Sequence, residues 1–304
     1  MWSQFQSVHF IGICGTAMAS VAVALQERGV RVTGSDQNVY PPMSTFLDSR
    51  GIEVREGYRE EHLADAPDLV VIGNAISRGN PEAEAVLERK LRYCALPELL
   101  KEAFIRGKRS IVLAGTHGKT TTTSLLTWVF EHNGLNPSYL IGGIPNNFSQ
   151  GARFTDSEWF IIEGDEYDTA FFDKRSKFLH YRPDVLMIGN LEFDHADIFD
   201  SISDIERQFQ YLLRGVPANG TVVINADQPR LSDLLDRGCW SQVIRYSCTD
   251  APAVWRAVAP PPDCRRFDVY CENHHVATVE WPLMGQHNLQ NAIGAIAATH
   301  AVGA

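Results

Sequence analysis

A short loop of glycine, lysine and threonine at residues 115–122 has the composition of a phosphate-binding site. It follows an apolar run at residues 111–114 and precedes a helical run that begins at Ser124, so we predict a strand, a loop and a helix. In such a loop the backbone N–H groups face a phosphate, Lys119 reaches the β- and γ-phosphates, and the hydroxyl of Thr120 binds Mg²⁺. The predicted phosphate-binding residues are Gly115, Thr116, His117, Gly118, Lys119, Thr120 and Thr121.

The loop is a shortened form of the Walker A pattern. Leu113 stands where the first glycine of G-x-x-x-x-G-K-[ST] belongs, which leaves G-x-x-G-K-T. The alternative is a turn rich in glycine and threonine that only caps the following helix. A lysine and a threonine directly after Gly118, at a strand-to-helix junction, favour phosphate binding.

Three later apolar runs also lead into polar side chains. The runs are residues 159–162 before Glu163, residues 185–188 before Asn190 and His195, and residues 222–224 before Asn225 and Asp227. If these strands lie parallel to residues 111–114, the loops that follow them meet at one edge of a sheet, where open α/β sheets bind ligands. Glu163 would then supply an oxygen ligand to Mg²⁺, with a solvated carboxylate as the alternative. A lone histidine such as His195 is by default structural.

A second turn, at residues 12–18, has features of a nucleotide-binding site. It follows a predicted strand at residues 8–11, and the acidic Asp36 comes about 20 residues further on, as in the dinucleotide-binding fingerprint. The third glycine of G-x-G-x-x-G is missing, however, and Cys14 stands at a position where glycine would ease the approach of a phosphate. A domain for NAD, a domain for a nucleotide sugar and a plain tight turn all remain consistent with this pattern.

Strands and helices alternate along the chain, which predicts an α/β protein with mostly parallel sheets. We expect a Rossmann-like nucleotide-binding domain at residues 1–107 and a P-loop ATPase domain at residues 108–304, because residues 106–110 look like a short linker. The length of 304 residues fits two domains of roughly 150 residues each. Residues 267–281 have the pattern of a small β-hairpin added to the second domain.

The composition narrows the classes of partner. With 27 basic and 37 acidic side chains the formal net charge is −10, which argues against a nucleic acid or an anionic membrane as a partner. No apolar run approaches the roughly 20 residues needed to cross a membrane, and no signal peptide is apparent. The six cysteines form no C-x-x-C pair, so we expect neither disulfides nor a zinc site, and a cytoplasmic location.

Four motifs together resemble the Mur ligases, the ATP-dependent amide-bond ligases of peptidoglycan synthesis. They are residues 115–122, residues 163–168, residues 190–195 and residues 285–292, in the order and spacing of that family. Within the family, Cys14, Ala17, residues 73–77 and residues 167–178 are similar to the branch that recycles murein peptides. The branch that adds L-alanine is the second candidate.

The resemblance implies a two-step reaction with ATP and Mg²⁺ as cofactors. The γ-phosphate of ATP passes to the carboxylate of UDP-N-acetylmuramate, and the acyl phosphate is then attacked by an amine. That amine belongs to the murein tripeptide L-Ala-γ-D-Glu-meso-diaminopimelate, or to L-alanine in the other branch. By this resemblance Lys119 contacts the ATP phosphates, Thr120 and Glu163 bind metal, and His195 binds a second metal ion. Lys119, Glu163 and His195 are therefore the expected catalytic residues.

The same resemblance assigns other residues to the two nucleotides. Asn288 and Asn291 are expected near the adenine of ATP. The expected UDP-sugar residues are Gly12, Gly15, Thr16, Asp36, Asn74, His117, Asn146 and Asn147. Mur ligases carry a third domain that binds the incoming amine, and we expect that domain to be absent here and the two-domain fragment to lack complete ligase activity.

Two other functions would use part of these features. A nucleotide-binding module without chemistry of its own would retain Lys119 and Thr120. An NAD-dependent oxidoreductase would use the first turn and Asp36, but it would leave Lys119, Glu163 and His195 without a role. Stabilisation by UDP-N-acetylmuramate and Mg-ATP, but not by NAD, would distinguish the ligase from the oxidoreductase.

Overall fold

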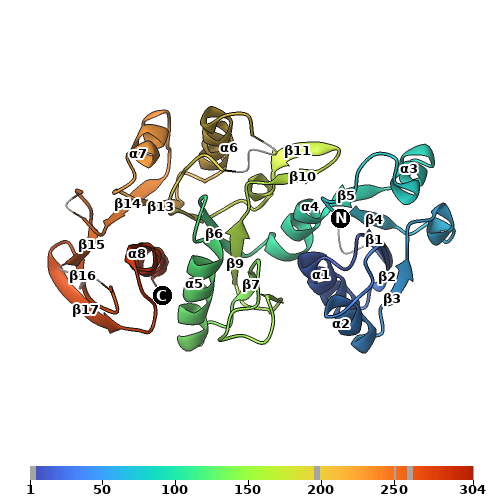
Figure 1. Cartoon of the computed structure of the whole chain (residues 1–304), viewed down its shortest axis with the longest axis horizontal. Coiled ribbons are helices and arrows are strands. Elements are labelled where there is room, and N and C mark those ends of the chain that lie inside the picture. The colour runs from blue at the N-terminus through green and yellow to red at the C-terminus, as the bar shows by residue number, and fades with distance from the viewer. Residues whose placement is uncertain (1–4, 195–198, 250, 259–262, 304) are drawn as a thin grey trace.

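The computed structural model describes residues 5–194, 199–249, 251–258 and 263–303, and it contains two main β-sheets that follow one another along the chain (Figure 1). The first sheet has five parallel strands in the order β3-β2-β1-β4-β5. Its elements are β1 (Ser7–Ile11), α1 (Thr16–Glu27), β2 (Arg31–Asp36), α2 (Met43–Ser49), β3 (Glu53–Glu56), β4 (Leu69–Ile72), α3 (Pro81–Glu88) and β5 (Tyr93–Ala95). The predicted Rossmann-like βαβ alternation is confirmed.

The second sheet has ten strands in the order β17-β16-β15-β14-β13-β12-β6-β9-β7-β8. Its strands are β6 (Arg109–Ala114), β7 (Ser138–Leu140), β8 (Ala152–Arg153), β9 (Trp159–Gly164), β12 (Val185–Ile188), β13 (Thr221–Asn225), β14 (Gln242–Ser247), β15 (Trp255–Val258), β16 (Arg266–Cys271) and β17 (His274–Glu280). Its helices are α5 (Lys119–His132), α6 (Ile202–Arg214), α7 (Pro229–Asp236) and α8 (Gln286–Ala301). A separate two-stranded sheet pairs β10 (Asp168–Ala170) with β11 (Asp173–Ser176).

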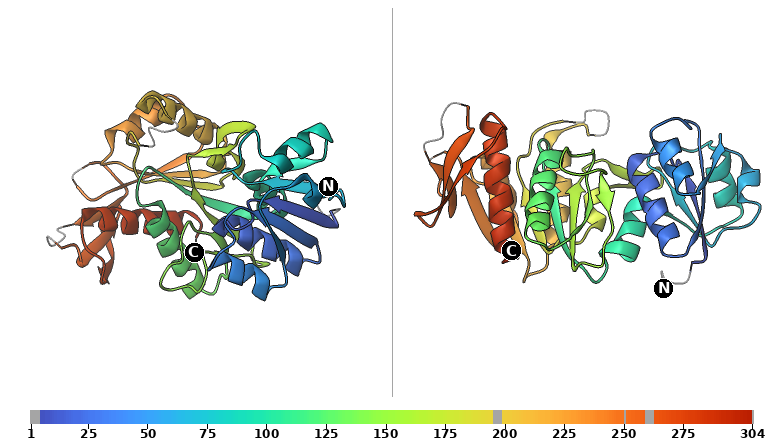
Figure 2. Two further views of the ribbon diagram at one scale, coloured as in Figure 1. Left: turned by 45° about the vertical axis from the view of Figure 1, so that its right-hand side comes forward. Right: turned by 90° about the horizontal axis from the view of Figure 1, so that it is seen from below.

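The four strands predicted to be parallel, β9, β6, β12 and β13, are adjacent and parallel. Their alternate side chains enter different cores, as the period of two in a strand requires. Ile111 and Leu113 pack with residues of α5 and α8, which lie side by side in Figure 2, whereas Val112 and Ala114 belong to the core that includes residues of α6 and α7. Both faces of the central sheet are thus covered, which explains the nearly continuous apolar runs.

The turn after β1 packs directly on the neighbouring strand. A Cβ at Gly34 in β2 would lie 2.5 Å from Cδ1 of Ile13, so a side chain at this position would displace the turn. Gly12 has a φ of +86°, which favours glycine over other residues. The glycines of this segment therefore place the start of α1 close to the sheet.

The predicted hairpin at residues 267–281 is confirmed as the antiparallel pair of β16 and β17. Glu272 and Asn273 form its turn, with φ values of 48° and 68°. His274 and His275 belong to β17. β14, β15 and the β10–β11 hairpin were not predicted from the sequence, because their residues mostly lack strict alternation of apolar and polar side chains.

Two sets of aromatic contacts join the parts of the chain that carry the two sheets. Near the connecting segment of α4 (Leu96–Leu100) and a π-helical turn (Lys101–Ile105), Phe104 packs on Phe154 with ring centroids 4.3 Å apart. On the β10–β11 hairpin, Phe172 packs edge-on against Tyr93 of β5 at 4.9 Å. Phe171 and Phe172 pack against a hydrophobic cluster that includes residues of the first sheet. The β10–β11 hairpin therefore contacts the part of the chain that carries the first sheet.

The sequence predicts neither a membrane-spanning helix nor a disulfide, and the structure bears on both. None of the helices within the described ranges is long and apolar enough to cross a membrane. All six cysteines lie within the described ranges, and each is a free thiol.

A buried carboxylate ties the first sheet to α3. Glu82 is fully buried; its Oε2 accepts a hydrogen bond from Ser35 at 2.5 Å and lies 3.3 Å from Nε2 of the buried His9. Its Oε1 lies 2.5 Å from Nδ1 of His62. Burial raises the pKa of Glu82, but hydrogen bonds from His9 and Ser35 outweigh it and hold that pKa below its ordinary value.

We expect Glu82→Gln to lower the free energy of unfolding by about 2 kcal/mol at pH 7, because hydrogen bonds to a charged group are lost. The folded-state pKa of Glu82 is below the ordinary 4.5, so its stabilisation is present above pH 4.5 and is lost as the pH falls through the folded-state value. Glu82→Gln should therefore weaken the loss of stability in acid. Urea unfolding across pH 3–7 measures both effects.

Glu88→Gln is the matched control, since Glu88 is an exposed residue of the same helix. We expect it to leave stability and its acid dependence unchanged. A Glu82→Gln protein indistinguishable from this control would contradict the structural role of the buried carboxylate.

Candidate functional site

The phosphate-binding loop connects β6 to α5, as the sequence predicts, and a neighbouring loop clamps it. The side chain of Asn190, after β12, accepts a hydrogen bond from the N–H of His117 at 2.8 Å and donates to its carbonyl oxygen at 3.0 Å. A Cβ at Gly115 would lie 3.1 Å from the carbonyl oxygen of Asn190, and Gly115 has a φ of +141°. Glycine is therefore needed here both for the backbone conformation and for the close approach.

Lys119 is held in an ion pair with a buried carboxylate. Its Nζ lies 2.8 and 3.0 Å from the two carboxylate oxygens of Glu166, which is 2% exposed. The same ammonium donates to the carbonyl oxygens of Gly115 at 2.8 Å and Thr116 at 3.2 Å. The lysine is thus folded back over its own loop, and a bound phosphate would compete with these contacts.

Thr120 and Glu163 are brought together by strand register. Leu113 of β6 pairs with Glu163 of β9, so the carboxylate stands level with the end of β6. Thr120 Oγ1 donates a hydrogen bond to Glu163 Oε1 at 2.9 Å. The N–H of Gly142 donates to Glu163 Oε2 at 2.8 Å. Both carboxylate oxygens are therefore fixed next to the loop.

This pair is chemically suited to Mg²⁺. A hydroxyl and a carboxylate oxygen lie 2.9 Å apart, and Mg²⁺ prefers oxygen ligands, of which one or two carboxylates and the phosphates of a substrate are typical. Within the described ranges, no group of three or more His, Cys, Asp or Glu side chains is arranged to hold a metal. The pair thus fits a metal shared with a nucleotide phosphate. His195, the other predicted metal ligand, lies outside the described residues.

The two asparagines expected near the adenine lie at the start of α8. Asn291 is 8% exposed and reaches the phosphate-binding loop, since a Cβ at Gly118 would lie 2.7 Å from its Oδ1. Asn288 is one turn earlier, and its Nδ2 donates to the carbonyl oxygen of Met284 at 2.8 Å. The structure therefore places Asn291 against the loop, and Asn288 earlier on the same helix, where its amide hydrogen-bonds to Met284.

A cavity of about 460 Å³ lies at the carboxyl edge of the first sheet. Five of the predicted UDP-sugar residues line it, namely Gly12, Gly15, Thr16, Asp36 and Asn74. The carboxylate of Asp36 accepts hydrogen bonds from the N–H groups of Cys14 at 2.8 Å and Asn38 at 2.9 Å, so it also fixes the turn. Burial and the nearby Asp36 raise the pKa of the Cys14 thiol to about 11, and this thiol is therefore neutral at pH 7.

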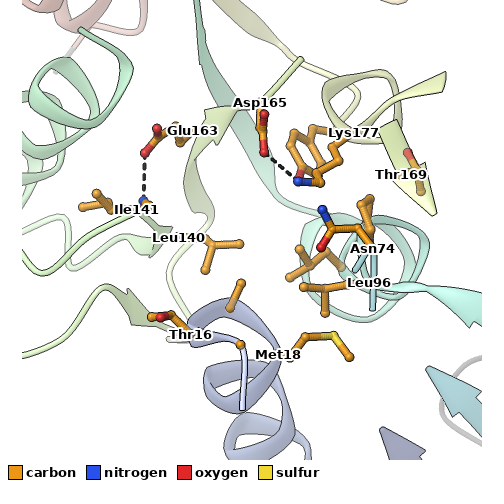
Figure 3. Close-up of a pocket in the computed structure, with 16 residues that line it drawn as sticks. Thr16, Met18, Asn74, Leu96, Leu140, Ile141, Glu163, Asp165, Thr169 and Lys177 are labelled. Carbon is orange, nitrogen blue, oxygen red and sulfur yellow. Dashed lines mark hydrogen bonds and ion pairs between the residues drawn. The ribbon is translucent and has the colours of Figure 1, made fainter. Parts of the chain in front are cut away.

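A second cavity, of about 300 Å³, lies between the two parts of the chain, and we call it the interdomain cavity (Figure 3). Its polar lining residues include Thr16, Asn74, Glu163, Asp165, Thr169 and Lys177. Figure 3 shows the start of α1 on one side of it and β9 on the other. Burial, and then the carboxylates of Asp165 and Glu163, raise the pKa of Tyr181 in its wall, so this phenol stays neutral. The cavity connects the first turn with the carboxylate beside Thr120.

Other predicted residues line neither cavity. Asn146 and Asn147 are exposed in the loop between β7 and β8, and neither lines the 460 Å³ cavity or the interdomain cavity. His117 lies at the rim of the phosphate-binding loop with a side chain 60% exposed and Nε2 3.8 Å from the carboxylate of Glu192. Thr121 is half-buried in the first turn of α5. The roles assigned to these residues stay predictions.

Glu166, Asn190 and Lys177 were assigned no role from the sequence. A signal was present for the first two, because each lies in a polar motif after a strand that neighbours β6. Lys177 lies beyond the β10–β11 hairpin, and only the folding of that hairpin returns it to the interdomain cavity. The local sequence therefore could not predict that Lys177 lines the interdomain cavity.

Two family models match the chain. The model described as "Mur ligase middle domain" matches residues 113–299, and the model described as "Mur ligase family, catalytic domain" matches residues 7–107. Together they cover the first sheet, the phosphate-binding loop and the second sheet apart from residues 109–112 of β6.

The curated relatives include two ligases with the same name, UDP-N-acetylmuramate–L-alanyl-γ-D-glutamyl-meso-2,6-diaminoheptandioate ligase. The protein from Haemophilus influenzae is 49% identical over 97% of this chain, and that from Escherichia coli is 45% identical over 97%. The chain spans 65% and 64% of the lengths of these relatives. A crystal structure of a UDP-N-acetylmuramate:L-alanyl-γ-D-glutamyl-meso-diaminopimelate ligase from Neisseria meningitides superposes with a TM-score of 0.92 at 45% identity, covering 99% of this chain and 94% of that one.

The contact between Gly118 and Asn291 gives a test of the loop geometry. In Gly118→Ala the new Cβ would meet Asn291 Oδ1 at 2.7 Å in a backbone with φ +78°. We expect the variant to lose about 1 kcal/mol of stability from overpacking, beyond the backbone strain, because only the amide end of the buried Asn291 has to move. Thermal unfolding measures the loss.

Gly134→Ala is the control, because Gly134 has a similar φ of +73° but no atom within 4 Å of the added Cβ. The difference between the two variants isolates the clash from the strain. Equal losses in both would mean that Asn291 does not pack on the loop as described.

Proposed function

The chain belongs to the Mur ligase family, and from that premise we propose that it forms the nucleotide-binding part of an ATP-dependent ligase of murein recycling. The ligase joins UDP-N-acetylmuramate to the tripeptide L-Ala-γ-D-Glu-meso-diaminopimelate through an acyl phosphate. The names of the 49% and 45% identical relatives support this acceptor over L-alanine. Because the chain spans 64–65% of those relatives, the activity is proposed for the whole protein.

The position of Glu163 is the main support for this proposal. Glu163 both accepts a hydrogen bond from Thr120 of the phosphate-binding loop and lines the interdomain cavity. The other side of that cavity is formed by the start of α1, including Gly15 and Thr16, which also line the cavity of the first sheet. A sugar nucleotide held at the first sheet could therefore extend its carboxylate toward the loop that holds ATP.

The charges support phosphoryl transfer between two anions. The γ-phosphate and the sugar carboxylate repel each other, so cationic groups must lie between or beside them. Lys119 supplies one positive charge once it exchanges its contacts with Glu166 for the phosphates. A Mg²⁺ ion at Thr120 and Glu163 would supply further charge stabilisation of the transferred group. The backbone of the loop and the start of α5 orient the phosphate chain.

The proposed reaction has two steps, and each forms one bond and breaks another. A carboxylate oxygen of the sugar attacks the γ-phosphorus, and the bond between that phosphorus and ADP breaks. The neutral amine of the acceptor attacks the carbonyl carbon of the acyl phosphate. Phosphate leaves with the former carboxylate oxygen, and the nitrogen releases one proton to solvent. An amide and inorganic phosphate result.

Removing the loop lysine tests the ATP site. A ligand at about 100 times its dissociation constant stabilises a protein by roughly 2.7 kcal/mol. We expect Mg-ATP and UDP-N-acetylmuramate each to raise the thermal midpoint of the chain, and NAD to leave it unchanged. Lys119→Ala should lose the shift with Mg-ATP and retain the shift with UDP-N-acetylmuramate. Lys174→Ala, on the exposed hairpin, is the control that should keep both.

A ligation assay tests the whole reaction on a polypeptide extended to the length of the relatives. We expect faster amide formation with the tripeptide than with L-alanine, and a loss of about 10²–10³ in rate for Glu163→Gln from weaker charge stabilisation. Nucleotide binding without any ligation would favour a binding module instead. A thermal shift with NAD alone would favour the oxidoreductase.

A further inference from the structure

Lys177 is the residue that brings a positive charge to the interdomain cavity, among the described residues that line it. Its Nζ donates a hydrogen bond to Asp165 Oδ2 at 2.7 Å and lies 5.7 Å from the ring centroid of Tyr167. Asp165 is itself fixed, since its Oδ1 accepts a hydrogen bond from the N–H of Tyr167 at 3.0 Å. An ammonium has three N–H donors, and the described part of the chain offers no hydrogen-bond partner for the other two of Lys177.

The position of Lys177 separates it from the metal-binding pair. In Figure 3 the carboxylate of Glu163 turns toward the segment that follows β7, near Ile141, whereas Asp165 turns the opposite way and meets Lys177. Asn74 and Leu96 lie on the side of Lys177. The cavity therefore has two polar ends on the β9 side, and only one of them adjoins the phosphate-binding loop.

The charge of the second end restricts what it can bind. Asp165 neutralises Lys177, so the pair as a whole is neutral. An anionic group placed there would lie next to the Asp165 carboxylate and be repelled by it. A neutral acceptor, such as an amide carbonyl oxygen, can instead take a charge-assisted hydrogen bond from Lys177 without that penalty.

Apolar side chains line the interdomain cavity on the same side as Lys177. Leu96, Pro97 and Leu100 from the α4 segment line the same cavity and offer a surface for a small methyl group. A carbonyl oxygen and a methyl group at adjoining positions are the two parts of an acetamido substituent. Asn74, which can donate or accept, stands where the amide could also be recognised.

We propose that Lys177, with Asn74 and the α4 wall, binds the 2-acetamido group of the sugar and makes the enzyme select N-acylated amino sugars. This inference rests on the proposed function, because it places the sugar in the interdomain cavity. The start of α1 then takes the phosphate side of the sugar, Glu163 faces its carboxylate, and Lys177 takes the remaining large substituent. The phosphate side, the carboxylate and the acetamido group of the sugar nucleotide are thus bound at three different places.

Binding of two ligands to the chain tests this assignment. One ligand is UDP-N-acetylmuramate, and the other is its 2-deoxy analogue, which lacks the acetamido group. Loss of one hydrogen bond to a charged donor corresponds to about 10-fold or more in affinity. We expect the wild-type chain to prefer the acetamido ligand by about 10-fold or more, and Lys177→Met to reduce that preference to about 2-fold. Isothermal titration calorimetry gives both constants.

Two further variants separate recognition from folding. Lys177→Arg retains a donor and should keep most of the preference, whereas Lys174→Met, which removes an exposed lysine of the hairpin, should keep all of it. Binding of Mg-ATP by every variant shows that the second domain is folded.

The outcomes distinguish the subsite from the proposed function. An equal loss for both ligands in Lys177→Met, or an unchanged preference, would overturn the role of Lys177 in reading the acetamido group. Equal binding of the two ligands by the wild-type chain would overturn the subsite and leave the proposed function in place. Failure of the wild-type chain to bind either ligand would contradict the proposed function itself.

Discussion

The parallel register of β6 with its two neighbours is the constraint on which the site depends. Leu113 pairs with Glu163 on one side, and Ala114 pairs with Ile188 on the other, two residues before Asn190. The carboxylate that meets the loop threonine and the amide that clamps the loop backbone are therefore both set by hydrogen-bonded strands. A slip of one residue would turn Glu163 to the opposite face of the sheet. The positions of Glu163 and Asn190 are thus set by backbone hydrogen bonds between strands rather than by the reach of long side chains.

Charged groups of the site are already paired within the protein. Lys119 meets Glu166 and Lys177 meets Asp165, and both acidic partners follow β9. Such pairs keep the two ammonium groups oriented and limit the cost of burying them. The difference between the pairs lies in what a ligand can exchange. The negatively charged phosphates of a nucleotide can compete for Lys119, whereas the neutral pair at Lys177 suits a neutral polar group.

The sequence predicted the strand, loop and helix around residues 115–122 because local composition determines them. It also predicted that Glu163 follows a strand parallel to β6, since buried parallel strands are continuous apolar runs. It could not predict that Glu166 would take the loop lysine, or that the β10–β11 hairpin would carry Lys177 back to the first part of the chain. Those contacts depend on tertiary folding. Asn146 and Asn147, assigned by resemblance alone, line neither cavity, and their role stays a prediction.

The most direct test follows one oxygen atom through the reaction. UDP-N-acetylmuramate labelled with ¹⁸O in its carboxylate would be incubated with ATP, the tripeptide and the polypeptide extended to the length of its relatives. Phosphorus NMR would then examine the inorganic phosphate that is released. Transfer through an acyl phosphate predicts one ¹⁸O atom in each phosphate formed with an amide bond. Unlabelled phosphate released in step with ligation would contradict the proposed site and its chemistry.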